Sequence, residues 1–403
     1  MSETPGALAD VRVISFGAFV AGTTAARVLA EMGADVVKVE ARGWPEVLRT
    51  PAYAIGDAVT EPSGAPNTVM YATLGRGTRN LSLDLRSPAA RPVFHRLVAA
   101  ADVLIENFGA HTLAGWGCAY EDLIVDNPRL VMLSLSAYGR SGPRAEYLGY
   151  ASTMSSFIGL SAAWGYAHGT LTDYVTGVTG ATAVAEALAR ARGAGQPTYI
   201  DVAQIDAMAP LLAGILAAPL NLGRDETFVA NRVPGSWLSG AFSSRGDDAW
   251  LAVDIENGGD WDLLCQFLDR PDLAAEAADK AERLEPELRE ALAAWVSRHS
   301  AFMGMHVLQK MGLAAAVVQT SEDIWRDPQL RVRGFGEVVD QPDLGPVTYP
   351  TSAQRWTRTP GSFRVSAPSR LGEHTNEVLR EWIDISDAEL ADLASRGAIF
   401  DAG

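Results

Sequence analysis

Hydrophobic positions along the first half of the chain follow two alternating spacings. Short apolar runs predict buried strands at residues 11–16, 35–40, 102–106, 130–136 and 198–203. Helical spacing predicts helices over residues 22–32 and 87–100, a long helix after Asp173 and a mostly apolar helix from Gln204. Strands that alternate with helices are typical of a parallel sheet covered by helices, so the sequence predicts an α/β fold.

The pattern changes after Leu222. Residues 224–325 mix a short strand at 250–254 with amphipathic helices at 261–267, 282–299 and 302–311. A chain of 403 residues is too long for one simple core. We therefore predict a large α/β domain that begins with residues 1–222 and a smaller α+β domain formed by residues 223–325.

Composition and charge narrow the function classes. A net charge of −16 argues against a nucleic-acid-binding protein, which needs a basic face. The longest apolar stretch, residues 207–222, is interrupted by Pro210, Gly214 and Pro219, so we expect no membrane span. The chain has only two cysteines and its first residues do not form a signal peptide, which together favour a cytoplasmic protein. Its six histidines lack metal-ligand spacing, so we expect no metal site.

Asp173 precedes an unusual run of small side chains. Residues 169–192 read GTLTDYVTGVTGATAVAEALARAR. Small residues let a backbone approach another surface closely, and the positive end of a helix favours an ionised carboxylate. From position alone, Asp173 can be a helix cap or a nucleophile.

A pair of glycines weakly suggests a dinucleotide site. Gly17 precedes the first predicted helix, Gly22 begins it, and Glu40 ends the next predicted strand. The spacing is G-x4-G and not G-x-G-x-x-G, so the sequence only weakly supports NAD binding.

Several short motifs, taken in order, are informative together. They are ADVRVI at residues 9–14, LAEMGADVVKVE at 29–40, LSLDLR at 81–86, DVLIENFG at 102–109, YGRSGP at 138–143, DPQL at 327–330, RG at 333–334 and LGEHT at 371–375. In this order and spacing, the chain closely resembles the family III coenzyme A transferases, which include formyl-CoA and carnitine-CoA transferases. The resemblance covers nearly the whole chain and is weakest between residues 221 and 319.

This resemblance implies a reaction and a nucleophile. The residue that matches Asp173 attacks an acyl-CoA in that family, and the reaction passes through a mixed anhydride and an aspartyl-CoA thioester. Coenzyme A and acyl-CoA are then substrates, a carboxylic acid is the acceptor, and no tightly bound cofactor is needed.

The resemblance also implies the coenzyme A contacts. Arg42 and Arg86 are the first candidates for phosphate ligands, with Arg79 and Arg140 as further candidates, because the planar guanidinium suits phosphate. The implied coenzyme A contacts are Val20, Ala21, Arg42, Leu83, Asp84, Leu85, Arg86, Asn107, Phe108, Gly109 and Tyr150.

The family's architecture adds an expectation about assembly. Because family motifs recur after residue 325, residues 326–403 are expected to return to the large domain and to complete it. This large domain is expected to contain a Rossmann-like parallel sheet. Two chains of the family interlock as rings, so we expect an interlocked dimer, with a homodimer favoured over a heteromer.

Two alternatives to an active transferase stay open. The related α-methylacyl-CoA racemases need a His directly after a glycine, whereas this chain has Tyr150 after Gly149. A catalytically silent subunit of a heteromeric transferase is the second alternative, and the presence of Asp173 argues against it. The acyl group is not defined, because Trp164, Tyr166 and Trp237 suggest a bulky apolar group while Arg232 suggests a second carboxylate.

Overall fold

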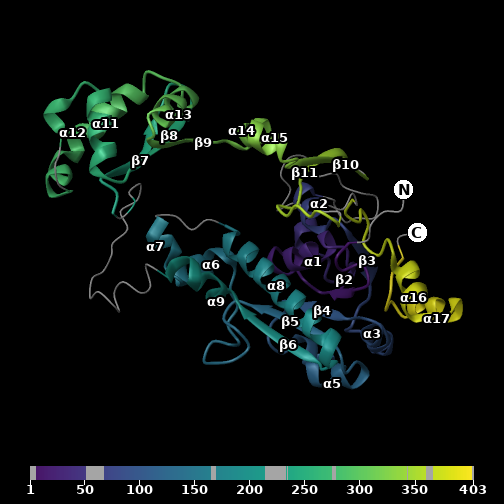
Figure 1. The fold of residues 1–403 in the computed structure, drawn as a ribbon. Helices are drawn as coiled ribbons and strands as arrows, with labels where there is room; N and C mark the ends of the chain where they lie inside the picture. Colours follow the sequence, from purple (N-terminus) through teal and green to yellow (C-terminus); the bar gives the residue numbers. More distant parts are fainter. Residues whose placement is uncertain are drawn as a thin grey trace. The chain divides into compact units, whose positions relative to one another are not determined.

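The computed structural model describes residues 6–50, 68–164, 169–213, 233, 235–274, 278–342, 344–359 and 366–401. The chain forms two compact units (Figure 1). Unit 1 comprises residues 1–158, 167–216 and 332–403, and unit 2 comprises residues 159–166 and 217–331. In the described part of the chain, no helix combines the length and the apolar character that a membrane crossing requires.

A six-stranded parallel sheet is the centre of unit 1. Its spatial order is β3-β2-β1-β4-β5-β6, which is the order of a doubly wound nucleotide-binding sheet. The central strand β1 pairs on one side with β2 and on the other with β4, so Ile14 lies opposite both Val37 and Leu104. The strands are β1 (Arg12–Ser15), β2 (Asp35–Glu40), β3 (Thr78–Ser82), β4 (Val103–Glu106), β5 (Val131–Ser136) and β6 (Thr198–Ala203). The predicted α/β class with a Rossmann-like parallel sheet is confirmed.

Helices cover both faces of this sheet. Successive side chains of a strand point to opposite faces, so both faces present apolar side chains to a layer of helices. Val13 and Val36 pack with α1 (Ala21–Glu31) and α8 (Leu171–Ala194) on one face. Ile14 and Val37 pack on the other face with α3 (Ala90–Ala99), α16 (Thr375–Ile383) and α17 (Asp387–Ser395). A strand buried on both faces reads as a continuous apolar run, which explains why most of the strands could be predicted.

The small residues after Asp173 allow α8 to pack closely. A Cβ at Gly177 would lie 2.6 Å from the Ala21 carbonyl oxygen of α1, and one at Gly180 would lie 3.0 Å from Leu133 of β5. The sequence predicts a close approach of this segment to another surface, and the surface is formed by α1 and the sheet. The helix begins at Leu171 and not after Asp173 as predicted, so Asp173 lies within its first turn.

The C-terminal segment of unit 1 packs against the first strands. The Leu83 backbone forms a bridge with Ile399, and the Asn80 carbonyl accepts a hydrogen bond from the His374 amide. Arg49 donates to the Ser369 carbonyl oxygen at 3.1 Å. This segment also contains the antiparallel pair β10 (Gly336–Gln341) and β11 (Gly345–Pro350).

Unit 2 has its own core around an antiparallel sheet of order β7-β8-β9. Trp261, Leu264, Leu288 and Leu292 are fully buried helix residues that pack with this sheet. The elements are α7 (Leu160–Trp164), β7 (Leu238–Ser243), β8 (Trp250–Ile255), α11 (Gly258–Phe267), α12 (Ala278–Val296), α13 (Ala301–Lys310), β9 (Ala314–Val318) and α14 (Ser321–Arg326).

Shorter helices connect these elements. In unit 1 they are α2 (Val69–Gly75), α4 (Thr112–Gly115), α5 (Tyr120–Asp126), α6 (Ala151–Phe157), α9 (Gln204–Met208) and the 3-10 helices Val47–Arg49 and Ala209–Leu212. A 3-10 helix at Pro271–Leu273 lies in unit 2, and α15 (Pro328–Val332) lies where the chain passes to its C-terminal segment.

Candidate functional site

The candidate residues of unit 1 follow the carboxyl ends of its strands. Ala21 follows β1, Arg42 follows β2, Arg86 follows β3, Asn107 follows β4, and Tyr150 lies in the segment after β5. Parallel strands end at a common edge, and open α/β sheets bind ligands at that edge, near the point where the strand order reverses. In this sheet the order reverses between β1 and β4.

Asn107 joins the two strand ends at this reversal. Its Oδ1 accepts from the Ala18 amide at 2.7 Å, and its Nδ2 donates to the Ala18 carbonyl at 2.8 Å. A Cβ at Gly22 would lie 3.0 Å from Asn107 Oδ1 and 2.4 Å from the Gly17 Cα. The G-x4-G spacing therefore serves close packing of the loop after β1, which accounts for both glycines without a dinucleotide.

Val20 and Ala21 are buried where this loop enters α1. Val20 packs in a small core with Leu48 and Tyr71, so what it can offer a ligand is its backbone. The preceding residue, Phe19, has a positive φ of 53°, and its amide donates to Glu46 Oε1 at 2.9 Å.

The segment after β3 divides into buried and exposed residues. The strand ends at Ser82, so residues 83–86 follow the strand and do not form its end. Leu83 and Leu85 are fully buried in the core, and the Leu83 backbone already pairs with Glu40 and Ile399. Asp84 and Arg86 are ion-paired at 2.6 Å, and Arg86 lowers the pKa of Asp84 below its ordinary value.

The four candidate arginines lie in different settings. Arg42 is exposed and stacks over the Phe400 ring, with 3.5 Å from its guanidinium carbon to the ring centroid. Arg86 lies against Gly43, the neighbour of Arg42, so these two cations share one part of the edge. Arg79 pairs with Asp35, Glu377 and Glu381, and Arg140 pairs with Glu106. Arg42 and Arg86 thus remain the better candidates for a phosphate.

Asn107, Phe108 and Gly109 line a hollow of about 80 Å³ together with residues 145–149. Tyr150 follows this segment, is 61% exposed, and meets the Phe19 ring edge-on with the centroids 5.6 Å apart. The structure therefore brings the segments after β4 and β5 together, next to the loop after β1.

Asp173 lies half-buried in the first turn of α8, and Gln204 is its hydrogen-bond partner. Gln204 directly follows β6, and its Nε2 donates to Asp173 Oδ1. Burial raises the pKa of Asp173 to about 6, and the Gln204 hydrogen bond partly opposes this rise. A carboxylate with a raised pKa and a neutral partner has the basicity and freedom expected of a nucleophile.

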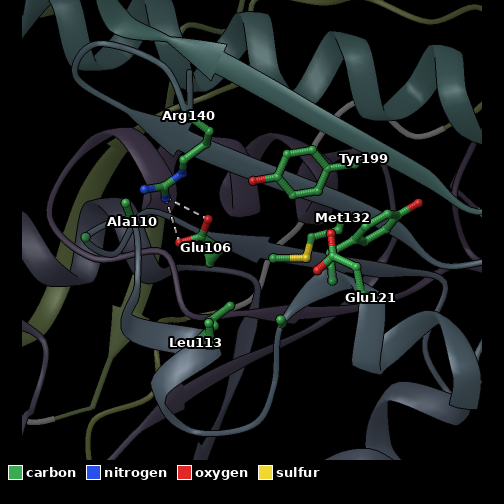
Figure 2. Close-up of a pocket in the computed structure, with 11 residues that line it drawn as sticks. Glu106, Ala110, Leu113, Glu121, Met132, Arg140 and Tyr199 are labelled. Atoms are coloured by element: carbon green, nitrogen blue, oxygen red, sulfur yellow. Dashed lines mark hydrogen bonds and ion pairs between the residues drawn. The ribbon is translucent and has the colours of Figure 1, made fainter. Parts of the chain in front are cut away.

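A larger cavity of about 470 Å³ lies on the β4–β5–β6 side of the sheet (Figure 2). Glu106 and Arg140 meet in it at 2.8 Å, beside Met132 and Tyr199. Burial raises the pKa of Glu106, and Arg140 and Ser134 oppose that rise. Asp173 does not line this cavity.

The sequence patterns do not single out Glu106 or Gln204 as a functional residue. A common signal could have found both, because each is a polar residue at or directly after the end of a predicted strand, as Glu40 is. Tyr166 and Arg232, the residues that suggested opposite acyl groups, lie outside the described residues. Within the described ranges, no group of three or more His, Cys, Asp or Glu side chains could hold a metal ion.

Comparisons with known proteins identify the family. The profile of CoA-transferase family III matches residues 8–375. Succinyl-CoA:mesaconate CoA-transferase of Haloarcula hispanica is 31% identical, over 93% of this chain and 96% of its own length. The succinyl-CoA–L-malate CoA-transferase alpha subunit of Chloroflexus aurantiacus is 30% identical, over 98% of this chain and 95% of its own length. A CAIB/BAIF family protein from Brucella suis has a similar structure, with a TM-score of 0.80, 26% identity and coverage of 92% of this chain and 98% of its own.

The chain belongs to CoA-transferase family III. It is accordingly an enzyme that transfers coenzyme A between carboxylic acids. The family resemblance inferred from the sequence motifs is confirmed.

Proposed function

We propose that Asp173 is the nucleophile of this transferase. The observation that carries the proposal is its hydrogen bond to the neutral amide of Gln204 in a half-buried position, which leaves the carboxylate with a pKa near 6. Such a carboxylate is ionised at neutral pH and is more basic than an exposed aspartate.

The proposed reaction has four balanced steps. Asp173 attacks the thioester carbonyl and expels the coenzyme A thiolate, which forms a mixed anhydride. The thiolate then attacks the Asp173 carbonyl carbon, releases the first acid and leaves an aspartyl-CoA thioester. The acceptor carboxylate attacks that thioester to form a second anhydride, and the thiolate finally attacks the acceptor's carbonyl. Each step exchanges one acyl bond for another, so the thioester energy is kept.

The arrangement of the edge supports an elongated substrate. Arg86 follows β3 and Gln204 follows β6, and five strand spacings of about 4.8 Å separate these strands by roughly 24 Å. We propose that Arg42 and Arg86 bind the phosphates at one end. The pantetheine arm would then pass the backbone at Val20, Ala21 and Asn107–Gly109, with Tyr150 beside it, and bring the thioester to Asp173.

The donor that we propose first is succinyl-CoA. Relatives that match nearly the whole chain are named for this donor, with dicarboxylic acceptors such as mesaconate and L-malate. Incubating the chain with succinyl-CoA and a panel of mono- and dicarboxylic acids, followed by mass spectrometry of the CoA products, identifies the acceptor.

We also propose an interlocked dimer in the cytoplasm. The chain leaves unit 1 for unit 2 and returns to unit 1, which is compatible with ring closure, and a second copy could cover exposed apolar residues such as Leu148 and Leu211. Cys118 and Cys265 are free and buried, as suits a reducing compartment. A folded, active monomer in light scattering at high dilution would exclude the dimer, and co-purification with a different homologous chain would favour a heteromer.

Replacement of Asp173 tests the function. We expect Asp173→Ala to abolish exchange and to retain coenzyme A binding, whereas Asp206→Ala, which removes an exposed aspartate from the first turn of α9, should stay active. Hydroxylamine added with acyl-CoA should modify Asp173, and peptide mapping that finds another residue would redirect the mechanism. Deuterium exchange at the α-carbon without CoA exchange would indicate a racemase, and binding without turnover would indicate a silent subunit.

A further inference from the structure

Gln204 is a buried amide at the carboxyl end of β6. It directly follows Ala203, the last residue of β6, begins α9 and is only 5% exposed. The next residue, Ile205, donates its amide to the Ala137 carbonyl and fixes this turn to the end of β5. Because a buried amide needs a polar partner, the contact with Asp173 accounts for glutamine at this position.

The hydrogen bond makes the two Asp173 oxygens unequal. A carboxylate oxygen only accepts, so the Gln204 nitrogen faces Oδ1. Among the described residues no hydrogen bond or ion pair is recorded for Oδ2. Oδ2 is therefore the oxygen that can attack a thioester, and Oδ1 is the oxygen that becomes the carbonyl oxygen of the aspartyl anhydride and thioester.

We propose that Gln204 donates a hydrogen bond to the oxyanion that forms on Asp173 Oδ1 during the reaction. The proposal rests on Asp173 being the nucleophile. Two of the four steps are attacks on the Asp173 carbonyl carbon, first by the thiolate on the anhydride and then by the acceptor carboxylate on the thioester. In each, the carbonyl electron pair moves onto Oδ1 and returns when the leaving group departs, and no proton or further reactant is needed.

The existing geometry suits this role because the donor is in position before charge develops. The backbone of Gln204 is held at the β6–α9 junction and Asp173 by the first turn of α8. A donor that needs no reorganisation stabilises a developing oxyanion much more than a mobile one does. Gln204 would thus contact the reacting atoms and count as a catalytic residue.

The test measures the step that Gln204 would assist. Aspartyl-CoA is formed on the enzyme with succinyl-CoA, the excess donor is removed, and consumption of the adduct by added carboxylate is followed in a single turnover. Gln204→Met keeps the side-chain length and removes the donor, and we expect consumption to slow by about 10²–10³-fold. Gln196→Met is the matched control, because Gln196 precedes β6 and Gln204 follows it. This control should react like the unchanged enzyme.

A second variant distinguishes donation from simple packing. Gln204→Glu has nearly the same shape, lacks a donor when ionised and regains one when protonated. Its adduct consumption should therefore rise as the pH falls toward 5, while consumption by the unchanged enzyme stays level. The acceptor must be an acid that is ionised throughout this range.

The outcomes separate this inference from the proposed function. If the unchanged enzyme forms no adduct on Asp173, the proposed function itself fails. If the adduct forms and Gln204→Met consumes it at the unchanged rate, or if Gln204→Glu shows no rise at low pH, the role of Gln204 is wrong and the nucleophile stands. If Gln204→Met does not fold, the pH response of Gln204→Glu decides.

Discussion

Glu40 and Asp173 are two carboxylates at the same edge of one sheet, and their partners differ in charge. Glu40 is fully buried at the end of β2 and pairs with Arg49 at 3.2 Å, while its Oε2 also accepts from the Glu46 amide at 2.8 Å. Asp173 is half-buried and has the neutral Gln204. Burial alone would raise the pKa of Glu40, but Arg49, Lys38 and the hydrogen bonds from the Glu46 amide and Asn80 together hold that pKa below its ordinary value.

The comparison shows that the charge of the hydrogen-bond partner, more than the depth of burial, decides what a buried carboxylate can do. Cations around Glu40 make it an unreactive anion that fixes the loop after β2 and, through Arg49, the C-terminal segment. Burial raises the pKa of Asp173 to about 6, and its neutral amide partner opposes that rise only in part. The structural carboxylate is stabilised as an ion, and the proposed nucleophile is held in a less favourable ionised state.

Removing the cation at Glu40 should have the largest effect on stability. Arg49→Met leaves a buried carboxylate without its main partner, and we expect a loss of about 3–5 kcal/mol in the free energy of unfolding. Denaturant titration measures this loss. Arg96→Met removes an exposed pair with Glu389 and should leave stability nearly unchanged. A small loss for Arg49→Met would mean that Lys38 and Asn80 suffice to hold the charge of Glu40.

The network around Glu40 also shows where prediction from sequence stops. Strands β1, β2, β4 and β5 could be predicted because their apolar runs are buried on both faces, and β6 could be predicted from the alternation of Tyr199, Ile200, Asp201 and Val202 although it is only partly buried. The strand β3 reads TRNLS and contains a single strongly apolar residue, so its pattern does not predict a strand. Its buried Asn80 donates to Glu40 and accepts from the Gly372 amide, partners that no local window of sequence contains.

The same limit applies to the candidate site. Asp173 could be selected because the family motifs surround it. Its partner Gln204 is 31 positions away, and the two side chains meet only when α8 packs beside the end of β6 in the folded chain. Likewise, the sequence indicates Arg140 but not its pairing with Glu106, which lies 34 positions earlier and on another segment. Local periodicity defines elements, while the partners of polar residues depend on packing between elements.

Removing the charge at Asp173 should stabilise the folded protein, whereas removing the charge at Arg49 should destabilise it. The pKa of Asp173 is about 6 in the folded chain against 3.8 for an ordinary aspartate, so ionisation opposes folding. This cost is absent below about pH 4, appears as the pH rises, and is complete above about pH 6. A difference of about two pH units corresponds to at most about 3 kcal/mol, so Asp173→Asn should stabilise the folded protein by up to that amount at pH 8.

Melting temperatures at pH 8 and pH 4 measure this effect. Asp173→Asn should melt higher than the unchanged protein at pH 8 and at the same temperature at pH 4. Asp206→Asn, at an exposed aspartate, should show no such difference. Stabilisation of Asp173→Asn at both pH values would show that packing of the amide, and not loss of the charge, is responsible.

The exposed pair Asp84–Arg86 provides a third setting, in which solvent weakens the ion pair and keeps the cation available. Arg86 is half-exposed, so exchanging Asp84 for a phosphate costs little desolvation.

We expect Arg86→Ala or Arg42→Ala to weaken coenzyme A binding by about 1–3 kcal/mol, as for a charge-assisted hydrogen bond, with little effect on folding. Calorimetry should show a larger loss for coenzyme A than for a pantetheine thioester without phosphates, since only coenzyme A carries the phosphates that these cations are proposed to bind. Arg396→Ala, at another exposed arginine paired with an aspartate, is the control and should bind coenzyme A normally. Equal losses for both ligands would mean that these arginines support the fold of the edge and do not contact phosphate, and the nucleotide end of the substrate would then have to lie elsewhere.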